Sequence, residues 1–259
     1  MKRPVTLAAV GVALLTVLAC ASPGGTGRTS RASSQSSPLY ALTLMRQGSG
    51  LLQQRRFTEA LEHFREARDL QPENATIYNM IGLCHLNLGE HEQALEAFNQ
   101  ALLRVPAYTD SRNNRGSTYL AMGEFQLAEV DFNAVLADTT YPHRWEVHYN
   151  LGVTFLQRNM LALAAENFRK AATAPSPVYE AFLRLAEIAE QRDRTEVAVD
   201  WLQDARLKFP ERLQAPLQLG RILVKSGRES EAVPYLREVI NADPDSEAAA
   251  QAHALLAEL

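Results

Sequence analysis

The chain has 259 residues, of which 46% are hydrophobic and 22% are charged, ordinary values for a folded soluble protein. Its formal net charge is −4, and the four basic residues within positions 1–37 leave −8 on the rest of the chain. Phosphate binding needs clustered lysine and arginine, so this acidic balance excludes nucleic acid as the main partner.

The first 19 residues have the layout of a lipoprotein signal peptide. A basic start (MKR) precedes an uncharged, mostly apolar run at positions 5–18. These 14 residues are too few to span a bilayer comfortably, which takes about 20, but they suit the apolar core of an export signal. The sequence Leu18-Ala19-Cys20 then resembles the bacterial lipobox, which implies cleavage before Cys20 and acylation of that cysteine.

Residues 20–40 are predicted to be the acylated cysteine and a flexible tether, because a segment rich in serine and glycine cannot bury a core. Stable anchoring takes more than one acyl chain, and lipoproteins of this kind carry several on one cysteine. No aspartate follows Cys20, a pattern that resembles export to the outer membrane, so the expected location is the periplasmic face of that membrane. Two alternatives stay open: a plain signal peptide with an incidental cysteine, and a disulfide between Cys20 and Cys84.

From residue 41 onward, alanine recurs every 34 positions within two sets of three, and a phenylalanine or leucine follows each alanine four positions later. The aligned alanines are Ala60, Ala94, Ala128, Ala164, Ala198 and Ala232. This period resembles that of the tetratricopeptide repeat, in which two antiparallel helices form one unit. The resemblance implies an all-α fold, a right-handed superhelical solenoid of six repeats. Residues 247–259 are predicted to form a helix that caps its open end.

Small residues mark two further positions of each predicted repeat. One lies in the first helix, at the place where the second helix crosses it closely. The other lies in the turn, where a residue that adopts positive φ with little steric strain ends the helix. The first-helix set is Gly48, Gly82, Gly116, Gly152, Ala186 and Gly220. The turn set is Gly89, Gly123 and Gly227, with Asn159 and Asp193 replacing glycine in the fourth and fifth repeats.

A two-residue insertion within positions 138–144 divides the array into repeats 1–3 (41–142) and repeats 4–6 with the capping helix (143–259). The sequences YPHR at 141–144 and YNLG at 149–152, together with the lipobox and the six repeats, resemble the type IV pilus biogenesis lipoproteins. These are the pilotins PilF, PilW and Tgl, and the resemblance is nearest to Tgl. It implies a partner, the outer-membrane secretin through which the pilus extends, and a role in the localisation and multimerisation of that secretin.

In such a solenoid the first helices line the concave face. The residues predicted to be exposed there in repeats 1–4 are Met45, Leu52, Asn79, Leu83, Leu86, Asn113, Leu120, Tyr149, Val153 and Leu156. This largely apolar set with two amides suits an amphipathic helix or an extended apolar peptide. In repeats 5 and 6 the same face is charged, so we expect the N-terminal half to bind the partner. The alternative is that several of the leucines pack between repeats.

No sequence motif indicates a catalytic or metal-binding site. Cys84 and His85 diverge by about 100° on a helix and cannot share a metal, and His143 and His148 are not at helical spacing. No set of nucleophile, base and oxyanion donors converges. We therefore predict a non-enzymatic protein with no metal, no small-molecule substrate and no cofactor besides the acyl chains on Cys20. The alternative to a pilotin is a general periplasmic adaptor lipoprotein for a protease, a cell-wall enzyme or an outer-membrane assembly machine.

Overall fold

A computed structural model describes residues 38–259, which form thirteen helices and no strand. The predictions on the signal peptide, Cys20 and residues 20–37 of the tether lie outside the described residues. The first helices of the repeats are α2 (Pro38–Gln53), α4 (Ala75–Asn87), α6 (Thr109–Ala121), α8 (Arg144–Gln157), α10 (Tyr179–Glu190) and α12 (Gln214–Lys225). The second helices are α3 (Phe57–Leu70), α5 (His91–Arg104), α7 (Phe125–Ala137), α9 (Leu161–Ala172), α11 (Thr195–Lys208) and α13 (Glu229–Ala242), and α14 (Glu247–Ala257) follows them.

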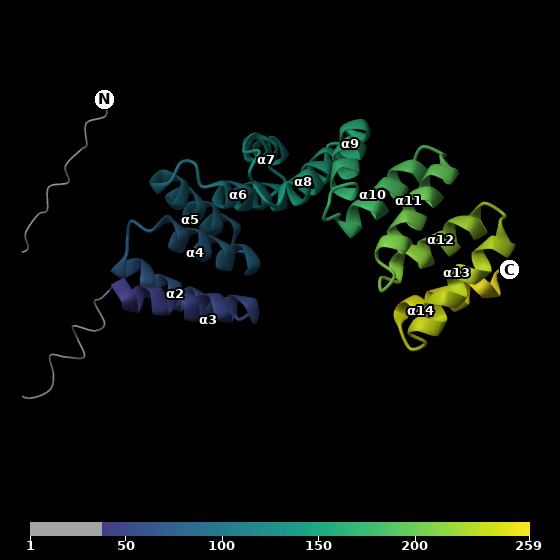
Figure 1. Ribbon diagram of the computed structural model, residues 1–259, viewed down its shortest axis with the longest axis horizontal. Coiled ribbons are helices and arrows are strands. Elements are labelled where there is room, and N and C mark those ends of the chain that lie inside the picture. Colours follow the sequence, from purple (N-terminus) through teal and green to yellow (C-terminus); the bar gives the residue numbers. More distant parts are fainter. Residues whose placement is uncertain (1–37) are drawn as a thin grey trace, which may run out of the picture. The chain divides into compact units, whose positions relative to one another are not determined.

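Each first helix packs against its own second helix, and each second helix packs against the next first helix (Figure 1). Helix α14 contacts both α12 and α13, the contacts that the first helix of a seventh repeat would make. The predicted all-α solenoid with a capping helix is therefore confirmed. Helix α2 begins at Pro38, three residues before the predicted start of the repeats, because proline fits the first turn of a helix, where its missing N–H is not needed.

The small residues of the first helices lie under bulky side chains of the second helices. Phe98 is fully buried against Gly82, where an added Cβ would lie 2.5 Å from the ring. A phenylalanine lies against the glycine in the same way in repeats 1, 3 and 4, and Leu236 takes this place against Gly220 in repeat 6. The fifth repeat holds Ala186 and Leu202 at these positions, both fully buried. This alternation of small and large residues fixes how closely the two helices of a repeat approach.

The turn between the two helices has one geometry in all six repeats. Gly89, Gly123 and Gly227 have φ values of 77°, 78° and 74°, and Asn159 and Asp193 have 56° and 55°, which confirms the five predicted positions. The first repeat has Arg55 at this place with φ 61°. In each turn the next N–H donates to the carbonyl five residues earlier at 2.8–2.9 Å, the Schellman pattern that ends a helix on a left-handed residue.

The insertion between α7 and α8 does not interrupt the apolar core. One continuous cluster of buried side chains runs from Ala128 in α7 to Ala252 in α14, and a separate cluster covers α2 to α5. Arg144 fixes the inserted loop, since its Nη1 donates to the carbonyls of Leu136 and Asp138 at 2.7 Å each. The apolar core is instead discontinuous between repeats 2 and 3, where α6 is polar.

Candidate protein-binding face

The first helices of neighbouring repeats contact one another directly, α2 with α4, α4 with α6 and α6 with α8. Four leucines occupy the same register on these helices, three residues before the positive-φ residue of each turn, and all four are half-buried. We call them the leucine ladder: Leu52, Leu86, Leu120 and Leu156. The corresponding residues of repeats 5 and 6 are Glu190 and Val224. The apolar register is therefore unbroken only over the first four repeats.

Nine of the ten predicted face residues are half-buried. Six of them also pack against the core clusters: Met45, Leu52, Leu120, Tyr149, Val153 and Leu156. Leu83 and Leu86 are half-buried without belonging to either cluster. The expectation of freely exposed leucines is thus corrected in part, because each of these side chains is partly covered and only part of its surface is accessible.

Asn79 does not belong to the accessible set. It is 3% exposed, and its Oδ1 accepts a hydrogen bond at 3.0 Å from Asn114 Nδ2 in the next repeat. A buried amide needs such a partner, since burying it unpaired would cost about 1–3 kcal/mol. The prediction that Asn79 is exposed for partner binding is therefore wrong, and the residue connects α4 to α6.

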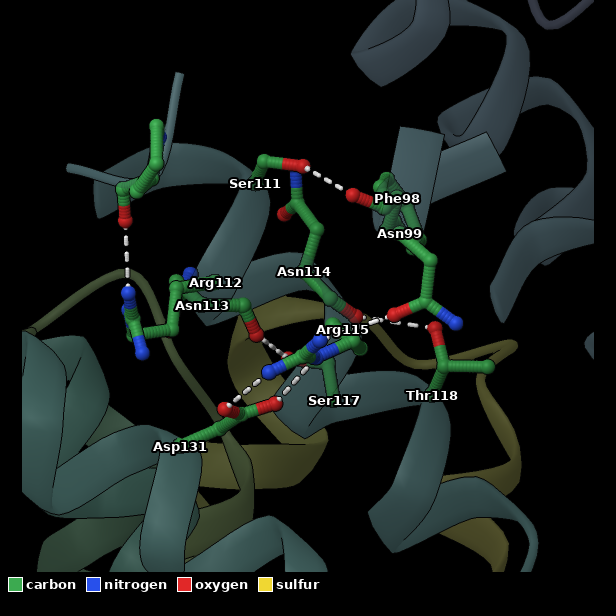
Figure 2. A network of polar contacts seen from close by, with 11 residues as sticks. Phe98, Asn99, Ser111, Arg112, Asn113, Asn114, Arg115, Ser117, Thr118 and Asp131 are labelled. Atoms are coloured by element: carbon green, nitrogen blue, oxygen red, sulfur yellow. Dashed lines mark hydrogen bonds and ion pairs between the residues drawn. The ribbon is translucent and has the colours of Figure 1, made fainter. Parts of the chain in front are cut away.

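Helix α6 carries a polar network that the sequence analysis did not anticipate (Figure 2). Arg115 donates to both carboxylate oxygens of Asp131 at 2.7 Å, and its Nη1 donates to Asn99 Oδ1 at 2.7 Å. Asp131 is 2% exposed, and the hydrogen bond to this carboxylate raises the pKa of Arg115. The sequence does contain a sign of this network, because Arg115 is charged where the neighbouring repeats have the apolar residues Ile81 and Leu151.

Asn113 lies next to this network with an unused acceptor. Its Oδ1 is one of three buried side-chain polar atoms without a hydrogen-bond partner in residues 38–259. Leaving such a buried amide oxygen without a partner costs about 1–3 kcal/mol, so Asn113 adds a destabilising position to the polar centre of α6. The accessible part of the face therefore consists of half-buried apolar side chains, the kind of surface that an amphipathic helix or an extended apolar peptide covers.

The predicted charged half of the face consists of ion pairs. Glu187 pairs with Arg184 at 2.8 Å, and Glu190 pairs with Arg221 at 2.8 Å. Lys225, at the end of α12, is exposed. Because the two carboxylates are already neutralised by neighbours, this half offers fewer free charges than its sequence indicates.

Among the clefts along the helices of residues 38–259, two that the sequence analysis did not predict lie between neighbouring helices of different repeats. One of about 400 Å³ lies between α12 and α14, with Leu217, Gln218 and Leu255 among its walls. The larger, of about 490 Å³, lies between α3, α4 and α5, with Arg65 on one helix and Glu96 on another. Both sit between repeats, so only the full packing of neighbouring units defines them, and no local sequence motif marks them.

Sequence models of the tetratricopeptide repeat match residues 45–111 and 113–179, and a second such model matches residues 191–259. The chain belongs to the tetratricopeptide repeat family. The matches extend across the insertion at positions 138–144 and reach the end of α14, in agreement with helices that stack without interruption. Proteins of this fold are typically interaction scaffolds rather than enzymes.

Two solved structures share this tetratricopeptide fold over most of the chain. PilF of Pseudomonas aeruginosa is 20% identical with a TM-score of 0.69, and the match covers 85% of this chain and 97% of that one. PilW, a type IV pilus biogenesis factor, is 20% identical with a TM-score of 0.71 and coverage of 84% and 98%. At such identities the likeness shows the fold alone.

Curated relatives match this tetratricopeptide protein over parts of their length. The lipoprotein NlpI homolog of Haemophilus influenzae is 35% identical over 80 residues, 30% of this chain and 26% of that protein. A co-chaperone of Cryptococcus neoformans with tetratricopeptide repeats and a J domain is 23% identical over 223 residues, 82% of this chain and 42% of that protein. The chain thus spans less than half the length of either relative.

The tetratricopeptide repeats carry little reactive chemistry in residues 38–259. No three His, Cys, Asp or Glu side chains of this part lie close enough to hold a metal ion, and none of its helices is both long and apolar enough to cross a membrane. Cys84 is fully buried and free, and desolvation raises the pKa of its thiol to about 12. It is therefore a small core residue.

Proposed function

We propose that this protein is an outer-membrane lipoprotein that acts as a pilotin for the type IV pilus secretin. In this role it is anchored by acyl chains on Cys20 at the periplasmic face. It promotes the outer-membrane localisation and multimerisation of the secretin by binding one of its segments. The observation that carries the proposal is the leucine ladder, a half-buried apolar register that continues over the first four repeats and fits a peptide.

The extent of the fold supports this assignment. The chain has a repeat array that overlays nearly all of PilF and PilW, and its own sequence adds the lipobox-like Leu18-Ala19-Cys20. The acyl chains supply the location, and the first-helix face supplies the selectivity. The specific resemblance to Tgl belongs to the same proposal.

Replacing the acylated residue tests the anchor. The Cys20→Ala variant is expected to fold normally, to leave the outer membrane and to lower the amount of heat-stable secretin multimers on immunoblots. Cys84→Ala is the matched control, because its thiol is fully buried and its loss removes no lipid. Normal multimers in Cys20→Ala cells would contradict the mechanism.

A second function is favoured by one observation, the 35% identity to the lipoprotein NlpI homolog over 80 residues. In that case the protein would be a periplasmic adaptor for a protease, a cell-wall enzyme or an outer-membrane assembly machine. Deletion of the gene separates the two. A pilotin deletion leaves secretin monomers and no surface pili, whereas an adaptor deletion alters envelope integrity and leaves piliation intact.

A further inference from the structure

Helix α7 differs from every other second helix in its outward surface. Its exposed residues are Gln126, Leu127, Val130, Asn133, Ala134 and Ala137, and none of them is charged. The other five second helices each expose at least two acidic or basic side chains. In Figure 1, α7 lies at the upper edge of the drawn helices. A charge-free outer face on one helix of an acidic protein is unusual, and exposed apolar surface of this kind is typical of interaction sites.

The two acidic residues within α7 do not disturb this surface. Asp131 is buried against Arg115 at 2.7 Å, and Glu129 pairs with Arg158 of the next repeat. Both carboxylates therefore meet partners inside the array. Val130 is 65% exposed and Leu127 is 47% exposed, although residues in register with Val130 are Glu62, Glu96 and Glu166.

The apolar residues of α7 have the spacing of a helix-pairing seam. Leu127, Val130, Ala134 and Ala137 follow one another at steps of three, four and three, the a/d spacing that keeps one stripe in line along a helix. Large residues occupy the first half of the stripe, and alanines occupy the second half. Leu163 and Val197, in register with Leu127 on α9 and α11, are also exposed, but those two helices carry exposed charged residues as well.

This order of large and small residues is complementary to itself. We propose that α7 binds the α7 of a second copy of this chain, antiparallel and about a two-fold axis near Phe132. In this pairing Leu127 faces Ala137 of the other copy and Val130 faces its Ala134, so each large side chain meets a small one. An isologous contact of this kind closes as a dimer. A parallel pairing would set large residues against large ones.

Cross-linking in membranes tests the pairing with the full-length chain. Two differently tagged chains, Val130→Cys and Ala134→Cys, are co-expressed and oxidised, and the mixed disulfide is quantified on immunoblots. The matched control pair is Glu166→Cys with Lys170→Cys, at the same register on α9. We expect at least tenfold more mixed disulfide from the α7 pair. Equal yields, or an excess of Val130→Cys homodimer over the mixed product, would overturn the antiparallel pairing.

Charge substitutions give an independent measurement by sedimentation of the full chain in detergent. Val130→Glu introduces the residue that three other repeats carry at this register, so the fold is kept, and the dimer is expected to become a monomer. Ala134→Lys is expected to do the same, while an equimolar mixture of the two variants dimerises again through the opposite charges. A wild-type chain that stays monomeric at every concentration, or a Val130→Glu dimer, overturns the proposal. If the wild type is monomeric and Val130→Glu loses secretin binding, the stripe belongs to the secretin instead.

Discussion

The ring of Phe98 lies so close to Gly82 that a methyl group in place of the glycine hydrogen would be 2.5 Å from Cε1. A close contact of a first-helix glycine with a bulky second-helix side chain occurs in five of the six units, four times with phenylalanine and once with Leu236. The recurring glycine therefore determines how closely the two helices of a repeat approach each other. The stacking of repeats, and with it the position of the leucine ladder, depends on that approach.

Gly82→Ala should therefore destabilise the protein, although alanine is the better helix former. Overpacking a tight core costs about 1–3 kcal/mol, more than the roughly 0.5–1 kcal/mol that alanine contributes to a helix interior. Gly50→Ala is the matched control, because Gly50 is also helical and has nothing within 4 Å of an added Cβ. Urea unfolding should move the midpoint down for the first variant and up for the second; midpoints that move together would contradict this packing.

The buried pair in α6 and α7 should tolerate joint replacement better than the loss of one partner. Arg115→Leu alone leaves the Asp131 carboxylate buried without its cation, which costs about 3 kcal/mol by analogy with other buried pairs. Adding Asp131→Asn gives the combination that repeat 4 has in register, Leu151 and Asn167, and should recover most of the stability. The free energy of unfolding of the single and double variants measures this coupling. Equal losses in both would show that the pair does not act as a unit.

His148 should make the stability depend on pH. Burial is the main cause that lowers its pKa, Lys170 and Arg144 add to the effect, and the Asn167 hydrogen bond and Glu166 oppose it. Because the folded pKa lies below the unfolded value of about 6.5, the unfolded chain binds the proton more tightly. The contribution of His148 to the free energy of unfolding is therefore fully present above about pH 6.5 and is lost as the pH falls.

Thermal unfolding at pH 7.5 and pH 5.5 measures this dependence. His148→Gln, which keeps a donor for Asn167 and cannot be charged, should lose less stability between the two pH values than the wild type. The exposed His253 provides the control variant, His253→Gln, which should behave as the wild type does. An unchanged pH response in His148→Gln would exclude this histidine as the source.

A charge on the leucine ladder should weaken partner binding without unfolding the array. Leu86 is half-buried and lies outside both core clusters, so Leu86→Asp is expected to fold and to bind the purified secretin at least tenfold more weakly. A tenfold change corresponds to about 1.4 kcal/mol. Leu103→Asp is the control, because Leu103 is 74% exposed on the second helix α5. Equal affinities of the two variants would remove the ladder from the binding surface.

The fold was predictable because each sequence feature has a local structural cause. The 34-residue period reflects the repeated helix pair, the small residues permit close helix packing, and the turn residues permit a positive φ. The glycine at position 89 predicts a positive φ, whereas the arginine at position 55 in the same register does not. Only the structure reveals the positive φ of Arg55. The site was less predictable, because exposure on a first helix depends on the neighbouring repeats. Asn79 is covered by Asn114, which is 35 residues away, and the partners of α6 depend on side chains from three helices. A period identifies equivalent positions, but it does not distinguish a residue that is covered by its neighbour from one that is open.

The most direct measurement of the central claim is photo-cross-linking in living cells from a benzoylphenylalanine placed at position 86 of the leucine ladder. The same probe at position 103 of α5 is the control. A secretin adduct from position 86 that is absent from position 103 is the predicted result. A secretin adduct from position 103 alone, or an adduct from position 86 with a different envelope protein and none with secretin, would contradict the proposed pilotin function.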